Sequence, residues 1–422
     1  MKKRKNNRQN ILVITAICLI GIYIYIYNIR EKQPSQLVEE KINYTIHNKN
    51  NNLPFLNITG DILDLKEKKQ EKVVKIDYAS TDINFSTYAK VKIQGQFTLE
   101  DPKKNYNINF YKDKDLTEKE YIDFKWGSFN KYTIKSNYKD SSQSRNVVTS
   151  NIVSKIYNKY KYFNNTPNNG SIDGFPIEVY INDKYHGLYT LNLNKENMFY
   201  EPSNKKYTLI SNQTIYGMRD ITKETSNWEN FEVEVGEENE KTLDEFNRLL
   251  EFIHTSTDEE FKRNIENYLD LDLLLTYYCY VKYAGLWDNL GKNLYFLTYD
   301  GKIWYTVFYD LDHSFGSHVA YTDIENRINE YTRDFPLWNK LEKNFGNELS
   351  IKYEELRNDI FKDQIIIKEF ENFINTIPED AYFKDKYKWP DSINYQISDL
   401  ENFLQVNTPK TDAYFNSLKT NN

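Results

Sequence analysis

Residues 286–316 read LWDNLGKNLYFLTYDGKIWYTVFYDLDHSFG, a stretch that joins strand-forming residues to acidic and amide side chains. Residues 293–298 and 302–309 are rich in the aromatic and β-branched residues that strands favour. Asp300-Gly301 lies between them, and this dipeptide is typical of tight turns. The stretch therefore predicts a β-hairpin with polar residues at both of its ends.

Four polar residues flank this hairpin. Asp288 and Asn293, five positions apart, come at its beginning, and Asp310 and Asp312 follow its second strand. Side chains two positions apart on extended backbone face the same side, so the two later carboxylates would repel each other unless a cation lay between them. We therefore expect the flanking residues to meet around one divalent cation. The alternative is that they form turns and caps, where Asp and Asn are common.

Phosphoryl transfer requires a set of this kind. Carboxylate or amide oxygens hold a divalent ion against the nucleotide phosphates, and a separate carboxylate lies beside the incoming hydroxyl. In protein kinases the base Asp precedes a metal-binding Asn by five positions, and a hairpin then leads to the metal-binding Asp before Phe-Gly. The order here is the same, so we predict Asp288 as the catalytic base or orienter. The ligands of Mg²⁺ would be Asn293 with Asp310 or Asp312, and ATP would donate the phosphoryl group.

The rest of the chain has strand patterns first and helical patterns later. Residues 176–193 read as a hairpin, whereas residues 145–160 and 241–285 carry apolar residues at helical spacing. Residues 201–240 are polar and are predicted to be an insertion, and residues 320–418 are predicted to be mainly helical. This order predicts an α+β fold with a β-rich N-terminal part and a helical C-terminal part.

Composition narrows the classes of function. The chain has 422 residues, of which 55 are basic and 62 acidic, and its net charge is −7. A strongly basic, polyanion-binding protein is therefore not expected, and we predict no nucleic-acid partner. The only two cysteines, Cys18 and Cys279, exclude a disulfide framework.

The first residues carry a targeting pattern. A short basic tail, residues 1–10, precedes the apolar residues 11–29, which are long enough to cross a bilayer as a helix. Basic residues before the apolar stretch favour a cytoplasmic N-terminus and a main domain outside. The sequence thus predicts a single-pass membrane protein, with a linker over residues 30–42 and a folded domain over residues 43–418. A cleavable signal peptide is the alternative.

Four blocks of sequence resemble those of a known family. They are KIQGQFTLEDPKKNYNINF (92–110), NYKDSSQSRN (137–146), VYINDKYHGLYTLNLNKE (179–196), and Asp288-x4-Asn293 followed by DLDHSFG (310–316). In this order they resemble the motifs of CotH, a family of spore-coat protein kinases. The resemblance implies an atypical protein-kinase-like fold for the predicted domain and an association with spores.

The resemblance also implies a function and further site residues. It implies an ATP- and Mg²⁺-dependent kinase that phosphorylates Ser or Thr of a protein partner, such as a coat or surface protein. Lys104 would be the cation that binds phosphate, because a point charge on a flexible stem suits that task, and Gly95 would let the backbone approach the phosphates. A solvated surface lysine and a plain turn are the alternatives. Arg145 is expected to pair with Asp140.

Two other functions remain open. Leu193 stands where the family usually has Glu, which favours a membrane-anchored pseudokinase or a coat-binding or surface-binding module without catalysis. A glycosyltransferase would use Asp310 and Asp312 to hold a metal-bound sugar nucleotide, but it gives no role to Asp288 or Asn293. Thermal shifts with ATP and with UDP-sugars would separate the glycosyltransferase from the kinase.

Overall fold

Alternating apolar and polar residues in the first half of the chain produce a closed barrel. In strand β3 (Asn84–Gln94), Ala89, Val91 and Ile93 are buried, whereas the residues between them are partly exposed. The strands pair in the order β1, β2, β3, β4, β7, β9, β8, and β1 pairs in parallel with β8. The other strands are β1 (Phe55–Thr59), β2 (Lys72–Ala79), β4 (Asn105–Tyr111), β7 (Lys131–Lys135), β8 (Gly174–Ile181) and β9 (Lys184–Leu193).

The computed structural model describes residues 53–95, 97–201, 206–214, 230–316 and 324–419. The predicted basic tail (1–10), membrane helix (11–29) and linker (30–42) lie outside these ranges, so the predicted division of the chain into these segments stays a prediction.

A second sheet carries the hairpin that the sequence predicts. Its strands are β10 (Thr208–Asn212), β11 (Phe231–Val235), β12 (Leu294–Thr298) and β13 (Tyr305–Phe308), in the order β11, β10, β12, β13. Strands β12 and β13 are antiparallel, and between them the carboxylate of Asp300 accepts hydrogen bonds from the N–H groups of Lys302 and Ile303. A small two-stranded sheet joins β5 (Ile122–Asp123) to β6 (Ser128–Phe129).

Helices make up most of the second half of the chain. They are α3 (Arg145–Tyr157), α4 (Glu240–Thr255), α5 (Asp258–Asn264), α6 (Leu271–Ala284), α7 (Ile324–Asp334), α8 (Pro336–Asn358), α9 (Asp363–Ile374), α10 (Glu379–Lys388) and α11 (Ile397–Leu418). Short 3₁₀ helices are η1 (Ile62–Asp64), η2 (Phe97–Leu99), η3 (Pro167–Gly170), η4 (Lys195–Asn197), η7 (Ile265–Asn267) and η8 (Trp287–Leu290).

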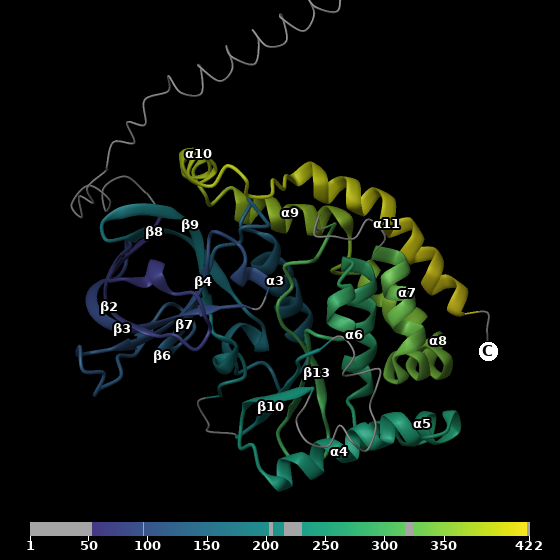
Figure 1. Ribbon diagram of the computed structural model, residues 1–422. Coiled ribbons are helices and arrows are strands. Elements are labelled where there is room, and N and C mark those ends of the chain that lie inside the picture. Colours follow the sequence, from purple (N-terminus) through teal and green to yellow (C-terminus); the bar gives the residue numbers. More distant parts are fainter. Residues whose placement is uncertain (1–52, 96, 202–205, 215–229, 317–323, 420–422) are drawn as a thin grey trace, which may run out of the picture. The chain divides into compact units, whose positions relative to one another are not determined.

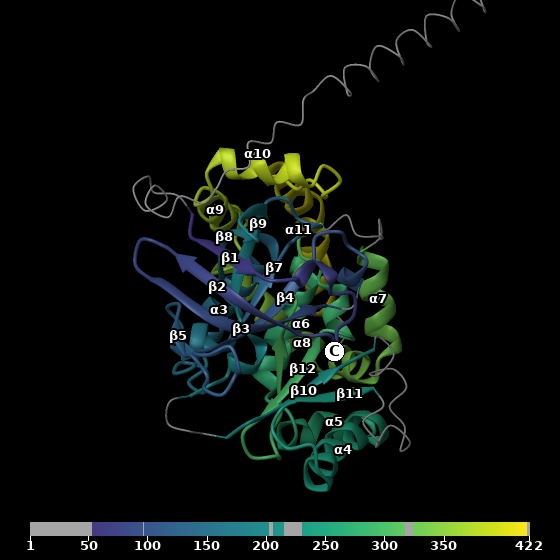
Figure 2. The ribbon, with the colours of Figure 1, turned by 60° about the vertical axis from the view of Figure 1, so that its left-hand side comes forward.

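The barrel and the helices lie side by side within the ranges that the structure describes. Figures 1 and 2 both show α9 and α10 at one end, beside the barrel strands β8 and β9, and α4 and α5 at the other end. Helix α3 lies between the barrel and α6, and the Tyr280 hydroxyl of α6 donates to the Thr149 carbonyl of α3. Helix α6 packs in turn against β13 and α8.

The predicted α+β class is confirmed, with a β-rich N-terminal part and a helical C-terminal part. The interpretation of residues 201–240 as an insertion is wrong for the described residues in that range. Strands β10 and β11 belong to the second sheet, and Leu209, Ile210 and Phe231 are buried in the core. These strands are short and have polar neighbours in sequence, so their pattern does not stand out.

The predicted localisation, a single-pass membrane protein, requires correction. In the ranges that the structure describes, every helix is too short or too polar to cross a membrane. Only α8 and α11 exceed 20 residues among the described helices, and both carry charged side chains along their length because only one face of each packs on the core. The segment predicted to span the membrane, residues 11–29, lies outside the described ranges.

Candidate active site

The loop that carries Asp288 is fixed by contacts on several sides. Helix α6 ends at Ala284. Gly285, which has left-handed backbone (φ 70°), caps the helix, and η8 follows. The Tyr277 hydroxyl donates to the Asn289 carbonyl at 2.7 Å, and the Trp338 indole donates to the Leu290 carbonyl at 2.7 Å. The Asn289 amide donates to the Tyr309 carbonyl at 3.0 Å, which ties the loop to the far end of the hairpin. The loop is therefore held as part of the core.

Asp288 is buried and bonded to Asn293. The Asn293 amide donates to Oδ2 of Asp288 at 2.9 Å, and Asp288 is 8% exposed. Burial raises the pKa of Asp288 to about 6, although electrostatic interactions with His313 and Lys292 lower it. A carboxylate with such a pKa is ionised at neutral pH and can still accept a proton, which is what a general base requires.

The carboxylates of Asp310 and Asp312 lie close to Asp288 and Asn293. The Asn293 amide also lies 3.4 Å from the Asp310 carbonyl, and the charges of Asp310 and Asp312 both raise the pKa of Asp288. The structure therefore brings together the four residues that flank the hairpin. The sequence argument for Asp310 and Asp312 needs correction, however, because β13 ends at Phe308 and Asp310 has left-handed backbone (φ 56°) rather than extended backbone.

Lys135, which the sequence analysis missed, forms an ion pair with Asp310. It is the last residue of β7, and its side chain is only 8% exposed. Burial opposes charge on both groups, yet Lys135 holds the pKa of Asp310 below its usual range and Asp310 raises the pKa of Lys135. A buried lysine is costly without an anionic partner, but the sequence alone does not show that Lys135 is buried, so it gave no signal for this ion pair.

Asp312 differs from Asp310 in its surroundings. Its side chain is 35% exposed, and Nε2 of His313 lies 3.7 Å from one of its carboxylate oxygens. Burial and the nearby charge of Asp310 raise the pKa of Asp312. A divalent cation between the two carboxylates would relieve this repulsion.

A second lysine also lies near the ring of Tyr309. Lys195, which is also largely buried, pairs with Glu234 of β11. Its ammonium lies 5.5 Å from the centroid of the Tyr309 ring, and the ammonium of Lys135 lies 5.7 Å from the same centroid. Two lysines thus lie beside Tyr309, the residue that precedes Asp310, and an ammonium group can bind phosphate oxygens.

The structure gives the two predicted nucleotide-binding residues local contacts. The Lys104 ammonium donates to the Leu99 carbonyl at 2.5 Å. Gly95 has left-handed backbone (φ 107°), and a Cβ there would overlap the Thr98 hydroxyl, so a tight turn alone accounts for this glycine. The adjacent Lys103 is buried and pairs with Asp385 at 2.8 Å. The described contacts of Lys104 and Gly95 do not include the four flanking residues.

The acidic residues fit a metal ion that phosphate helps to hold. Within the described ranges, no three His, Cys, Asp or Glu side chains group closely enough to bind a metal by themselves. Mg²⁺ in phosphoryl-transfer sites is typically held by one or two carboxylates together with substrate phosphates. Asp310, Asp312 and the amide oxygen of Asn293 supply oxygen ligands of this kind.

Comparison with family models decides the family. The model described as CotH kinase protein matches residues 91–408. The chain belongs to the CotH kinase family. The matched residues begin in β3 and end in α11, so they include every residue of the candidate site described above, and they confirm the resemblance seen in the sequence. A comparison with curated proteins finds no significant match. Membership of the family indicates a kinase-like protein, with ATP and a divalent metal as the implied cofactors.

Proposed function

We propose that this protein transfers the γ-phosphoryl group of ATP to Ser or Thr hydroxyls of a protein partner, such as a coat or surface protein. The observation that carries the proposal is the meeting of Asp288, Asn293 and Asp310 through hydrogen bonds between residues on both sides of one hairpin. A β-rich part beside a helical part, with the acidic residues near their junction, supports an atypical kinase-like fold.

Each side chain has a task that its surroundings support. Asp288 orients the attacking hydroxyl and accepts its proton, since the Asn293 amide fixes one carboxylate oxygen and leaves the other available. Asn293, Asp310 and Asp312 would hold Mg²⁺, which supplies positive charge to the phosphates. Lys135 then binds phosphate oxygens, because its ammonium is already positioned beside Asp310.

Transfer of labelled phosphate from ATP to a protein acceptor tests the proposal. We expect the Asp288→Ala, Asp310→Ala and Asp312→Ala variants to lose transfer. Asp300→Asn is the matched control, because Asp300 is a carboxylate of the same hairpin that caps its turn at the opposite end. Transfer that persists in all three Ala variants would overturn the proposal.

A pseudokinase is the second candidate, and Leu193 supports it. This residue is buried in the core, where an apolar side chain replaces the Glu common in the family. A rise in melting temperature with ATP and Mg²⁺ but no transfer by the wild-type protein would favour this function, because a ligand that binds only the native state stabilises it.

A further inference from the structure

The beginning of helix α3 contacts the segment that carries both acidic residues. Oδ1 of Asn146 accepts a hydrogen bond of 2.9 Å from the N–H of Leu311, the residue between Asp310 and Asp312. One turn further along α3, the hydroxyls of Thr149 and Ser314 share a hydrogen bond of 2.7 Å. Both contacts are buried, so α3 holds this segment at two points along one face.

The segment needs such support because its backbone is strained. Asp310 (φ 56°) and Phe315 (φ 49°) both have left-handed backbone, which is unfavourable for residues with a Cβ. Backbone of this kind persists where the surrounding structure fixes it. At the far end of the segment, the Phe315 N–H donates to the Ala284 carbonyl at 2.7 Å. The end that carries the carboxylates is fixed by Asn146.

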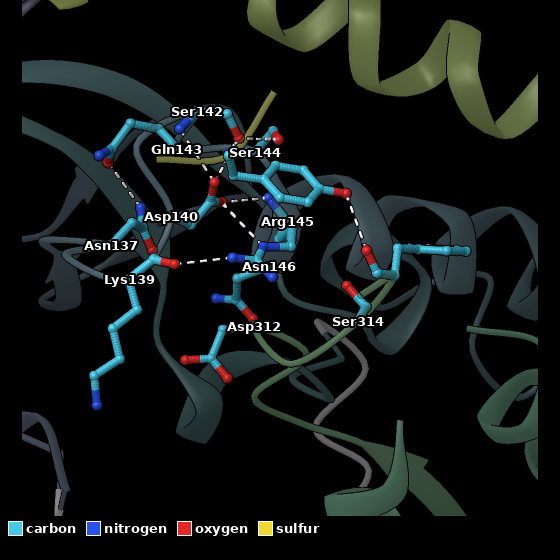
Figure 3. A network of polar contacts seen from close by, with 12 residues as sticks. Asn137, Lys139, Asp140, Ser142, Gln143, Ser144, Arg145, Asn146, Asp312 and Ser314 are labelled. Atoms are coloured by element: carbon cyan, nitrogen blue, oxygen red, sulfur yellow. Dashed lines mark hydrogen bonds and ion pairs between the residues drawn. The ribbon is translucent and has the colours of Figure 1, made fainter. Parts of the chain in front are cut away.

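Asn146 follows Arg145, which anchors the start of helix α3. The Arg145 guanidinium is buried, donates to the Lys139 carbonyl at 2.8 Å, and lies 4.2 Å from the centroid of the Tyr395 ring. Oδ2 of Asp140 accepts a hydrogen bond of 2.8 Å from the Arg145 backbone N–H. Figure 3 shows Asp140 beside Arg145, with Asn146 below them in the view and Asp312 below Asn146. These contacts of Arg145 fix the start of helix α3, from which the Asn146 side chain reaches the Leu311 N–H.

We propose that Asn146 is a positioning residue that sets the affinity of the site for a divalent metal by fixing the backbone between Asp310 and Asp312. The proposal rests on the proposed function, since it assumes that these carboxylates bind the metal. Residues that orient metal ligands from outside the coordination shell typically contribute 10- to 100-fold to metal affinity. Loss of the Asn146 amide should therefore weaken metal binding more than it weakens folding.

The test compares variants of two asparagines on the same helix. Asn146→Ala removes the acceptor for Leu311, and Asn146→Asp keeps an acceptor oxygen. Asn151→Ala is the matched control, because the Asn151 amide donates to Asp173 at 3.1 Å, away from the acidic segment. Mn²⁺ affinity is measured calorimetrically with a non-hydrolysable ATP analogue present, and amide hydrogen exchange is measured over residues 310–315.

We expect Asn146→Ala to bind Mn²⁺ about tenfold or more weakly and to exchange amide hydrogens faster over residues 310–315. Asn146→Asp should recover most of the affinity, and Asn151→Ala should keep the wild-type affinity even if its melting temperature falls. If Asn146→Ala does not fold, Asn146→Leu carries the same test, because it removes the acceptor for the Leu311 N–H and keeps a side chain of similar size.

The outcomes separate this inference from the proposed function. Wild-type Mn²⁺ affinity in Asn146→Ala would overturn the inference alone. Tight Mn²⁺ binding that depends on Asn146, without phosphoryl transfer by the wild-type protein, would overturn the proposed function alone. Absence of Mn²⁺ binding in the wild-type protein would overturn both.

Discussion

Among single residues, Asp288 makes the stability of the folded protein depend on pH, because folding shifts the pKa of its carboxyl group. Its pKa rises from 3.8 to about 6 on folding. Between these values the folded protein binds more protons than the unfolded chain, so this residue makes the protein less stable as pH rises through that window. Asp288→Asn should therefore raise the free energy of unfolding above pH 6 by roughly 1–3 kcal/mol and have little effect below pH 4. Urea unfolding at several pH values in EDTA measures this difference.

Asp300→Asn is the control for that experiment, because the pKa of Asp300 shifts in the opposite direction on folding. Backbone N–H groups of Lys302 and Ile303 hold the pKa of Asp300 below its usual range despite partial burial. Its contribution to stability is present at neutral pH and is lost as pH falls through the folded pKa. Asp300→Asn should accordingly lower stability at neutral pH. For Asp288→Asn, by contrast, a lower free energy of unfolding above pH 6 would contradict the prediction, because it would show that the buried Asp288 carboxylate does not destabilise the folded protein.

Lys135 and Lys104 are competing candidates for the cation that binds phosphate. The structure places the Lys135 ammonium on Asp310 and the Lys104 ammonium on the Leu99 carbonyl. We expect Lys135→Met to reduce phosphoryl transfer by on the order of 100-fold, whereas Lys104→Met should retain transfer. Initial rates with labelled ATP measure both variants. Loss of transfer in Lys104→Met with activity retained in Lys135→Met would favour the residue that the sequence suggested.

At the scale of elements, α10 is joined to the barrel by a buried ion pair. Lys103 lies just before β4 and pairs with Asp385 of α10, and Asp385 also accepts the Leu188 N–H of β9 at 2.7 Å. Removing one member of a buried pair leaves an uncompensated charge. Lys103→Met should therefore lower the free energy of unfolding by roughly 3–5 kcal/mol. Equilibrium urea unfolding at neutral pH measures the loss.

An exposed pair in the same barrel provides the control for Lys103. Lys112 pairs with Glu118, and both side chains are about half exposed or more. Lys112→Met should change stability far less than Lys103→Met does, since solvent already screens that pair. Similar losses in the two variants would mean that the contact between Lys103 and Asp385 does not hold α10 to the barrel.

The elements that could be predicted from sequence are those with a strong local signal. The hairpin of β12 and β13 is such a case, because apolar strands flank an Asp-Gly turn whose residues bond to one another. Strands β10 and β11 lack that signal and become strands only by pairing with β12 and with each other. The conformation of Asp310 was also missed, because contacts from α3, far away in sequence, fix the segment that follows it.

At the scale of the whole molecule, the site depends on contacts between distant parts of the chain. Asp288 and Asn293 were predictable as a pair because five positions separate them. Lys135 was not, because its ion pair with Asp310 spans 175 positions in sequence and forms only once the barrel lies beside the second sheet. The barrel itself closes through β1 and β8, which come from distant segments and pair in parallel. Local patterns indicate the elements, and packing decides which charges meet.

This contact between two parts of the molecule predicts that metal and nucleotide bind cooperatively. Lys135, which is buried, and Asp310, which is partly exposed, neutralise each other's charge. Mg²⁺ alone would bind the Asp310 carboxylate and leave the Lys135 ammonium without its partner. ATP alone would place a negatively charged phosphate beside the negatively charged Asp310 carboxylate. Only both ligands together leave every charge compensated. The rise in melting temperature with Mg²⁺ and ATP should therefore exceed the sum of the rises with either one, and Lys135→Met should abolish the excess. Additive shifts in the wild-type protein would show that the pair does not couple the two ligands.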